Sequence, residues 1–189
     1  MQPRDNSPPA GEAGPLDDET HARVLDHQSS GMIHAITEKG LHLVKLRVPA
    51  DGRSHSPGTR FAFRESEEED ESASLLGTLR HRDLSTMAQN ELISVVKSIL
   101  IDYPDNCLSF YNKAGNLTLK KHAFTLLPGI GDSKAMSMVE IRGRVGWEKI
   151  SDLDEVCQID SAGLLAERLC QEILDHHMTP SLLNLLIRA

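Results

Sequence analysis

The segment of residues 126–135, LLPGIGDSKA, restricts the fold more than any other part of the sequence. Two glycines, Gly129 and Gly131, flank one apolar residue, Ile130, between two stretches with the apolar spacing of helices. Glycine adopts positive φ without a steric penalty and leaves its backbone N–H accessible, while Ile130 can anchor the turn in the core. Together with the free N–H groups at the start of the next helix, predicted over 132–142, these groups form a concave site for an anion such as a phosphate.

This pattern resembles the helix-hairpin-helix motif, in which two helices joined by a Gly-apolar-Gly turn hold a sugar-phosphate backbone without reading its sequence. The register of the motif is completed by Leu126, Ala135, Met138, Ile141 and Arg142. The backbone N–H groups expected to bind one phosphate are those of Gly129, Ile130, Gly131 and Ser133. Lys134 lies near enough to add positive charge. The alternative is a tight interhelical turn that serves only packing or protein contacts.

The rest of the chain divides into four parts by composition and periodicity. Residues 1–19, rich in proline and acidic residues, are predicted to be a disordered acidic tail. Residues 20–83 contain five short strand-like stretches typical of a small barrel of the oligonucleotide-binding (OB) type, with an acidic loop over 65–73. Residues 84–177 are predicted to be helical, and 178–189 form an apolar helix or tail. We therefore expect an α+β fold of two domains, an OB-like β-barrel followed by an all-α helix-hairpin-helix domain.

Several local features carry more specific expectations. Within Leu41–Val48 the apolar positions change from odd to even numbers, which indicates a strand that changes its buried face through a bulge or strong coiling. Thr86 begins a capping box for the first helix, and Thr118 is predicted to cap a helix that runs through Leu126. A degenerate second copy of the hairpin over 156–162 lacks the glycines, and we expect it to be structural. The apolar tail SLLNLLIRA is expected to dock on the helical domain or on another protein.

Charge is unevenly distributed along the chain, although its formal net value is −8. Residues 20–64 and 109–149 each hold seven basic and three acidic residues, whereas 65–71 hold six acidic residues and no basic one. Local field rather than net charge decides whether a polyanion docks, so both basic regions are candidates for phosphate contacts. The cations expected to surround the turn are Lys120, Lys121, Arg142 and Arg144. Those expected to extend the contact across the barrel are Lys45, Arg47, Arg60 and Arg64.

Aromatic and basic side chains alternate on the predicted strand 60–64, so the two kinds point to opposite faces. If Phe61 and Phe63 are buried, the neighbouring arginines face the solvent. In the alternative, the two phenylalanines form an exposed platform on which bases stack. Aromatic residues make up only 4% of the chain, and we therefore favour phosphate contact over stacking.

Other classes of function find little support in the sequence. No P-loop, nucleophile elbow or HExxH segment is present, and the nine histidines lack metal-ligand spacing, so we expect no enzyme, no cofactor and no metal. Three cysteines without CxxC spacing favour a reducing compartment, and we expect a cytoplasmic protein. The sequence has neither an apolar run of about 18 residues nor an apolar signal-peptide region, so we expect no membrane association.

Several segments together resemble an archaeal family catalogued as domain of unknown function 655. They are ARVLD (22–26), GTRF (58–61), DLST (83–86), FYNKAG (110–115), Thr118, His122, the turn itself, Trp147, SDL (151–153) and LAER (165–168). The resemblance covers residues 20–177 and implies an OB-type barrel before the helix-hairpin-helix part, with nucleic acid as the class of partner. The chain departs from the family at Asp132, where lysine is common, and at Glu65–Glu71, which replaces a shorter basic connection.

These observations lead to one expected function and one alternative. We expect non-enzymatic, sequence-independent nucleic-acid binding through backbone phosphates. RNA is preferred over DNA, because barrels of this type commonly serve RNA-handling proteins. The alternative is a protein–protein adaptor in a ribonucleoprotein or DNA-repair assembly, which binds its partner through the hairpin domain and residues 178–189.

Overall fold

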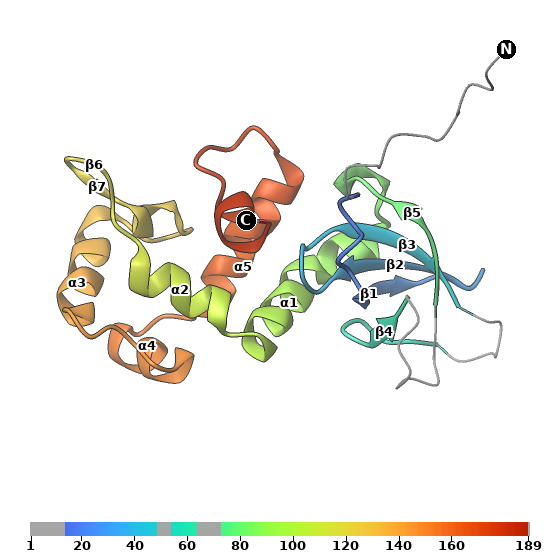
Figure 1. Cartoon of the computed structure of the whole chain (residues 1–189), viewed down its shortest axis with the longest axis horizontal. Coiled ribbons are helices and arrows are strands. Elements are labelled where there is room, and N and C mark those ends of the chain that lie inside the picture. Colours follow the sequence, from blue (N-terminus) through green and yellow to red (C-terminus); the bar gives the residue numbers. More distant parts are fainter. Residues whose placement is uncertain (1–13, 49–53, 64–72, 189) are drawn as a thin grey trace, which may run out of the picture.

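The structure, a computed structural model, describes residues 14–48, 54–63 and 73–188. It combines a curled five-stranded antiparallel sheet with a group of helices that extends from one side of the sheet (Figure 1). The fold class is α+β. The first part of the predicted tail, residues 1–13, and nearly all of the predicted acidic loop, residues 65–72, lie outside the described residues.

Five strands form the sheet in the order β4-β1-β2-β3-β5, and every neighbouring pair is antiparallel. The strands are β1 (His21–His27), β2 (Met32–Thr37), β3 (Leu43–Arg47), β4 (Arg60–Ala62) and β5 (Ser74–Thr78). Ala73, just before β5, donates a backbone hydrogen bond of 3.0 Å to the carbonyl oxygen of Ala62 on β4. The two edge strands thus approach each other, and the sheet curls into a half-barrel.

Both faces of the sheet are buried, and this explains the apolar pattern of β3. The inner face forms its own core from Ala22, Val24, Ile33, Ala35, Val44, Leu46, Val48, Phe61, Phe63 and Ala73. On the outer face, Leu41 and Leu43 belong to the core that the helices share. β3 pairs with β2 in one unbroken register, but its pairing with β5 has a register shift between Lys45 and Leu46, as expected of a strand with a bulge. Leu41 and Leu43 serve the core shared with the helices, whereas Val44, Leu46 and Val48 serve the inner core, so the buried positions change from odd to even numbers.

Five α-helices follow the sheet in the described part of the chain. They are α1 (Thr86–Asp102), α2 (Asp105–Lys113), α3 (Asp132–Arg142), α4 (Ile150–Cys157) and α5 (Ser161–Leu174). The shorter helical turns are η1 (His81–Asp83), η2 (Ala123–Leu126) and η3 (Leu183–Ile187), the last of them a π-helix. Ser85 caps α1 by accepting a hydrogen bond of 3.2 Å from the backbone N–H of Ala88, so the cap lies one residue before the predicted Thr86. None of these helices has the length and apolarity to cross a membrane.

Residues 118–126 do not form the predicted helix. The strands β6 (Asn116–Thr118) and β7 (Lys121–His122) make a short hairpin, and η2 follows it directly. The side-chain oxygen of Thr118 accepts hydrogen bonds of 3.3 and 3.1 Å from the backbone N–H groups of Lys120 and Lys121. These bonds close a tight turn, and a side chain that engages nearby N–H groups competes with helix formation.

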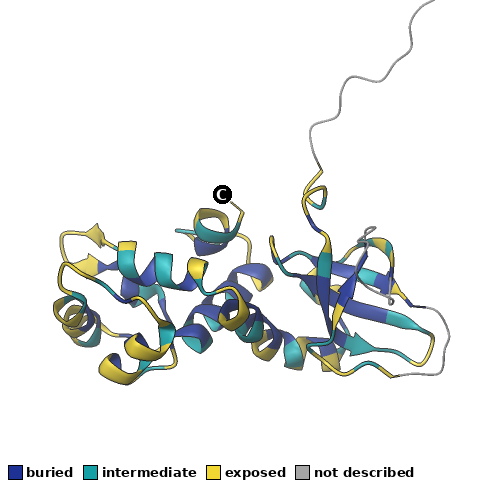
Figure 2. Ribbon diagram, turned by 60° about the horizontal axis from the view of Figure 1, so that its bottom comes forward, coloured by how far each residue is buried: buried dark blue, intermediate teal, exposed yellow. Residues whose placement is uncertain are grey.

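Helix α1 joins the sheet to the other helices, because it contacts β1 and α5. One buried apolar core runs from the outer face of the sheet through the helices (Figure 2). The C-terminal segment docks on this body: Leu182 and Leu183 are buried. Arg188 donates hydrogen bonds of 2.8 and 3.1 Å to the carbonyl oxygens of Gly40 and Leu41, which fixes the segment to the turn between β2 and β3.

Ordered structure begins before residue 20, where the sequence predicts the disordered tail to end. Glu19 is buried, and its carboxylate accepts hydrogen bonds of 2.8 Å from the Thr37 hydroxyl and 2.5 Å from the backbone N–H of Gly40. The carboxylate therefore satisfies polar groups of the β2–β3 turn that would otherwise be buried without a partner.

Candidate nucleic-acid interface

The turn before α3 is open at both of its glycines. Gly129 has a φ of +74°, and Ile130, which is 9% exposed, donates its N–H to the carbonyl oxygen of Leu127 at 3.2 Å. A Cβ added to Gly129 or Gly131 would meet no heavy atom within 4 Å, so the space over both residues is free. Gly131 is the N-cap of α3 and supplies no capping side chain, which leaves first-turn N–H groups accessible to a ligand.

The turn is held in place by buried side chains on both sides. It connects η2 to α3, so the element that precedes it is one 3₁₀ turn and not a full helix. Phe124 of η2 and Leu127 are buried, and the Phe124 ring lies 5.7 Å from that of Tyr111 on α2. Ala135 and Met138 of α3 enter the same core. The open backbone is therefore carried by a rigid support.

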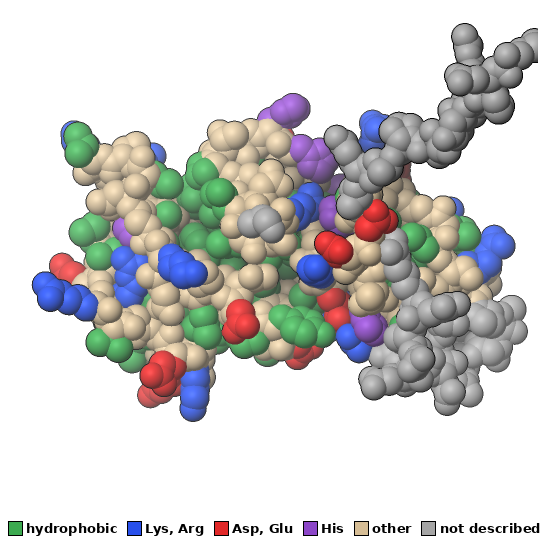
Figure 3. Space-filling model, in the orientation of Figure 1, with side chains coloured by type: hydrophobic (Ala, Val, Ile, Leu, Met, Phe, Trp, Pro, Cys, Tyr) green, Lys and Arg blue, Asp and Glu red, His purple; other side chains and the backbone are tan. Residues whose placement is uncertain are grey.

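The turn borders a groove of about 830 Å³. Ile93 and Lys97 of α1 line it on one side, and Gln158 and Asp160 of the α4–α5 loop line it on another. The two interhelical loops therefore face the same groove. On the face drawn in Figure 3, Lys and Arg side chains are spread over the helical half with acidic side chains between them, so the local charge is mixed.

The α4–α5 loop, the degenerate second copy, is closed to an anion by its own carboxylate. Asp160 is the N-cap of α5 and accepts a hydrogen bond of 3.0 Å from the backbone N–H of Gly163. Its other carboxylate oxygen lies 2.6 Å from the Lys97 ammonium. Burial opposes the ionisation of Asp160, but the hydrogen bonds from Lys97 and Gly163 outweigh it and lower the pKa of the carboxyl. A Cβ on Gly163 would collide with this carboxylate, so the arrangement requires glycine there.

Two of the predicted phosphate-binding cations are used within the chain. The Lys134 ammonium donates to the carbonyl oxygen of Cys157 at the end of α4. The Arg142 guanidinium donates to the carbonyl oxygens of Tyr111 and Ala114, at 3.1 and 2.7 Å, and its carbon lies 5.5 Å from the centre of the Phe124 ring. Both side chains bind helix-end carbonyls, where a positive charge is favourable.

The remaining predicted cations do not gather at the turn. Lys120 and Lys121 are exposed on the β6–β7 hairpin, and Arg144 is exposed beyond the C-terminal end of α3. An 11-residue helix is about 16 Å long, so Arg144 lies far from the glycine turn. On the sheet, Lys45 is half-buried and Arg47 is exposed, and α1 separates them from α3 (Figure 1).

A model of a family described as protein of unknown function (DUF655) matches residues 16–181. The chain belongs to the DUF655 family. The crystal structure of Af1531 from Archaeoglobus fulgidus, a DUF655 protein, superposes with a TM-score of 0.76 at 21% identity, over 90% of this chain and all of that one. The uncharacterized protein MJ0038 from Methanocaldococcus jannaschii is 25% identical over 97 residues, which are 51% of this chain and 45% of that relative. The likeness to Af1531 supports the fold, and none of these descriptions names an activity.

An ion-pair network at the junction of the sheet and α1 in this DUF655 chain was missed by sequence reasoning. The buried Glu38 carboxylate pairs with Arg23 at 2.7 Å and with Arg60, one of the predicted cations, at 2.9 Å. Arg23 also pairs with Asp102 of α1 at 2.6 Å. Burial opposes the ionisation of Glu38, but both arginines outweigh it and lower the pKa of the carboxyl. Strand pairing and the packing of α1 on the sheet bring these charges together, and no local sequence pattern signals the network.

The strand that carries Arg60 also bears on the alternative in which aromatic side chains stack on bases. Phe61 and Phe63 are buried in the inner core, so the alternative in which they form an exposed stacking platform was wrong. Arg64, the last predicted cation of the DUF655 chain, lies outside the described residues.

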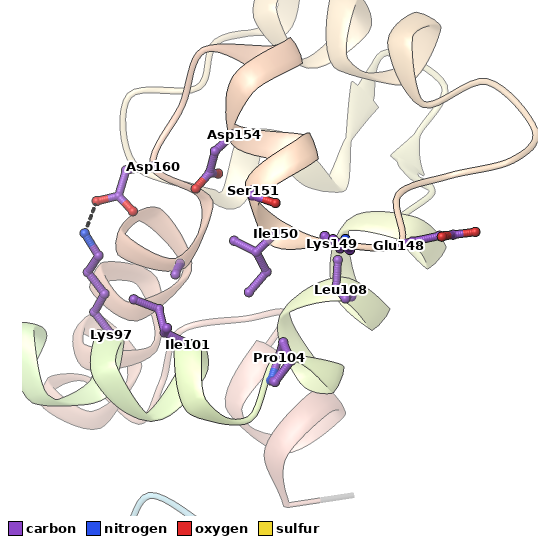
Figure 4. Close-up of a pocket in the computed structure, with 11 residues that line it drawn as sticks. Lys97, Ile101, Pro104, Leu108, Glu148, Lys149, Ile150, Ser151, Asp154 and Asp160 are labelled. Carbon is purple, nitrogen blue, oxygen red and sulfur yellow. Dashed lines mark hydrogen bonds and ion pairs between the residues drawn. The ribbon is translucent and has the colours of Figure 1, made fainter.

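A second pocket of the DUF655 chain, of about 490 Å³, lies between α1, α2 and α4 (Figure 4). Ile101, Leu108 and Ile150 give it apolar walls, and the Lys97–Asp160 pair lines both this pocket and the groove. Asp154 accepts a hydrogen bond of 2.8 Å from the backbone N–H of Ser161. Within residues 14–48, 54–63 and 73–188, no three side chains are grouped in a way that could hold a metal ion.

Proposed function

We propose that this DUF655 protein binds nucleic acid without reading its sequence, by holding a backbone phosphate at the Gly129–Gly131 turn. The observation that carries the proposal is the free space over both glycines beside an α3 N-terminus without a capping side chain. Backbone N–H groups without a capping side chain, at the positive end of a helix dipole, suit a phosphate oxygen, although the Ile130 N–H is already donated to Leu127. The turn itself offers backbone hydrogen-bond donors, which suit the binding of an anion.

We further propose that the curled sheet is an OB-type barrel and that η2, the turn and α3 form a helix-hairpin-helix unit. The hydrogen bond between Ala73 and Ala62, which links the two edge strands, supports the barrel assignment. Exposed Arg47 and half-buried Lys45 on β3 then provide a second region of phosphate contact. RNA is the ligand we expect to bind more tightly, by analogy with other barrels of this type.

The test uses the full chain and two alanine variants. Gly131→Ala places a methyl group in the free space where the phosphate would lie, and Gly131 has a φ of −83° that alanine adopts without strain. Gly115→Ala is the matched control, because a Cβ there also meets no heavy atom within 4 Å. Binding of labelled single-stranded RNA, single-stranded DNA and duplex DNA is measured by fluorescence anisotropy at 50 and 200 mM salt.

We expect affinity of the unmodified chain to fall about 20- to 40-fold between the two salt concentrations, as for the neutralisation of about three phosphates. Gly131→Ala should weaken binding about tenfold, while Gly115→Ala should leave it unchanged. Circular dichroism of both variants checks that the fold is retained. Binding that does not respond to salt, or equal affinities for the two variants, would remove the phosphate site from this turn.

A further inference from the structure

The β6–β7 hairpin presents an apolar tip next to two positive charges. Leu119, in the turn between the strands, is 104% exposed relative to a fully accessible leucine. Leu117, on β6, is 42% exposed. Lys120 and Lys121 follow directly and are exposed as well. The hairpin therefore offers a projecting leucine that is followed directly by two cations.

The tip is held stiffly by bonds within the hairpin. The Thr118 hydroxyl oxygen closes the turn by accepting hydrogen bonds from the backbone N–H groups of the two lysines. At its base, Ala123 donates a backbone hydrogen bond of 2.8 Å to Gly115. His122 is buried there, and one of its ring nitrogens lies 3.1 Å from the carbonyl oxygen of Ala114. A leucine at the end of such a support loses little conformational entropy when it enters a binding site.

We propose that Leu119 is a wedge that inserts between two neighbouring bases of the bound nucleic acid, while Lys120 and Lys121 contact the flanking phosphates. Nucleic acid presents apolar base faces next to negative charges, which matches an apolar tip next to positive charges. Apolar side chains inserted at base steps are a known way for proteins to unstack and bend nucleic acid. The inference rests on the proposed function and adds a contact with bases to the contact with the backbone.

The wedge lies within reach of a strand held at the glycine turn. Leu119 and Gly129 are ten positions apart, and four of the residues between them form η2. A 3₁₀ turn rises about 2 Å per residue and extended chain at most about 3.5 Å, so the two positions are within about 30 Å. One turn of a duplex is about 34 Å, so a single nucleic acid can contact both positions.

The test replaces Leu119 and measures base unstacking directly. Oligonucleotides with a single 2-aminopurine report unstacking by an increase in fluorescence. They are titrated with the full chain, with Leu119→Ala and with the control Leu174→Ala, which removes a leucine that is 62% exposed at the end of α5. Neither leucine is buried, so both variants are expected to fold as the unmodified chain does.

We expect the fluorescence to rise severalfold with the unmodified chain and with Leu174→Ala, and to stay flat with Leu119→Ala. Leu119→Ala should also bind about three- to tenfold more weakly. The wedge is overturned if Leu119→Ala raises the fluorescence as much as the control does, even where binding still depends on Gly131. If the unmodified chain binds no oligonucleotide, the proposed function fails together with the wedge.

A lipid surface is the competing partner for a tip of this composition, and vesicles of phosphatidylserine and phosphatidylcholine test it. We expect no cosedimentation of the chain with these vesicles at 100 mM salt. Cosedimentation that Leu119→Ala abolishes, without any change in 2-aminopurine fluorescence, would contradict the wedge and assign the tip to a membrane.

Discussion

At the scale of single residues, the two interhelical loops differ in the N-cap residue of the helix that follows. Gly131 leaves the start of α3 without a side-chain cap, whereas Asp160 fills the start of α5 and pairs with Lys97. A carboxylate at the N-cap accepts first-turn N–H groups that a phosphate would otherwise bind. The N-cap residue therefore leaves these donors available at α3 and occupies one of them at α5.

Asp132, exposed in the first turn of α3, should weaken phosphate binding. We predict that Asp132→Asn raises affinity for RNA about threefold at 50 mM salt and less at 200 mM, because one repulsive charge is removed and salt screens it. The variant should lose about 0.5 kcal/mol of stability, since the carboxylate also favours the helix dipole. Anisotropy and thermal unfolding measure the two effects. Glu140→Gln, an exposed site at the other end of α3, is the control and should leave affinity unchanged.

His42 should make stability fall in acid. Burial and, secondarily, the positive charge of Arg188 lower the pKa of His42 to about 4. In the unfolded chain the His42 ring binds a proton near pH 6.5, whereas in the folded chain it stays neutral down to about pH 4. The stability that comes from the neutral ring is therefore complete above pH 6.5 and is lost as the pH falls towards 4. Because the ring is half-exposed, we expect a loss of about 1 to 2 kcal/mol.

Urea unfolding at pH 7 and pH 4.5 measures this loss. His42→Gln should show a smaller decrease than the unmodified chain, and the exposed control His176→Gln should show the same decrease as the unmodified chain. An undiminished decrease in His42→Gln would assign the acid sensitivity to other groups.

At the scale of elements, the sequence predicts the helices and turns whose position is set by apolar periodicity and by turn-forming residues. The predicted bounds of α3, 132–142, agree with the structure, because the segment has a helical apolar pattern and ends before a glycine. The glycine turn was found for the same reason. The partners of Lys134 and Arg142 could not be predicted, because they lie 23 and 28 residues away and depend on how the helices pack. Over 118–126 a hairpin replaces the predicted helix, and the Thr118 side chain closes its turn.

Arg142 should stabilise the contact between α2 and α3 more than it contributes to binding. Arg142→Met retains an apolar side chain but removes the hydrogen bonds to Tyr111 and Ala114. We predict a loss of about 2 kcal/mol in the free energy of unfolding, with RNA affinity changed less than twofold. Chemical denaturation and anisotropy provide the two values. A large loss of affinity at unchanged stability would instead make Arg142 a phosphate ligand.

At the scale of the whole molecule, the sheet and the helices share a hydrophobic core, which two successive domains with separate cores would not have. One core spans the outer face of the sheet and the helices, and Arg188 bonds the C-terminal segment to the β2–β3 turn. Such contacts between distant segments make unfolding cooperative. They also hold the sheet and α3 in a fixed relation.

A substitution that removes one methyl group from the inner core of the sheet tests whether the sheet and the helices unfold together. Ile33→Val should cost about 1 kcal/mol and lower the unfolding midpoint by about 3 °C. Trp147, the single tryptophan, lies in the helical part, so its fluorescence reports the region remote from Ile33. We predict equal shifts by tryptophan fluorescence and far-ultraviolet circular dichroism. A fluorescence midpoint that does not move would mean that the two parts unfold independently.

The most direct test of phosphate binding at the turn is the NMR spectrum of the ¹⁵N-labelled chain during titration with unlabelled single-stranded RNA. We predict that the backbone N–H signals of Gly131, Asp132 and Ser133 shift and saturate together. The N–H of Gly163, which already donates to Asp160, should not move. RNA binding that shifts other signals and leaves these three unchanged would contradict the account.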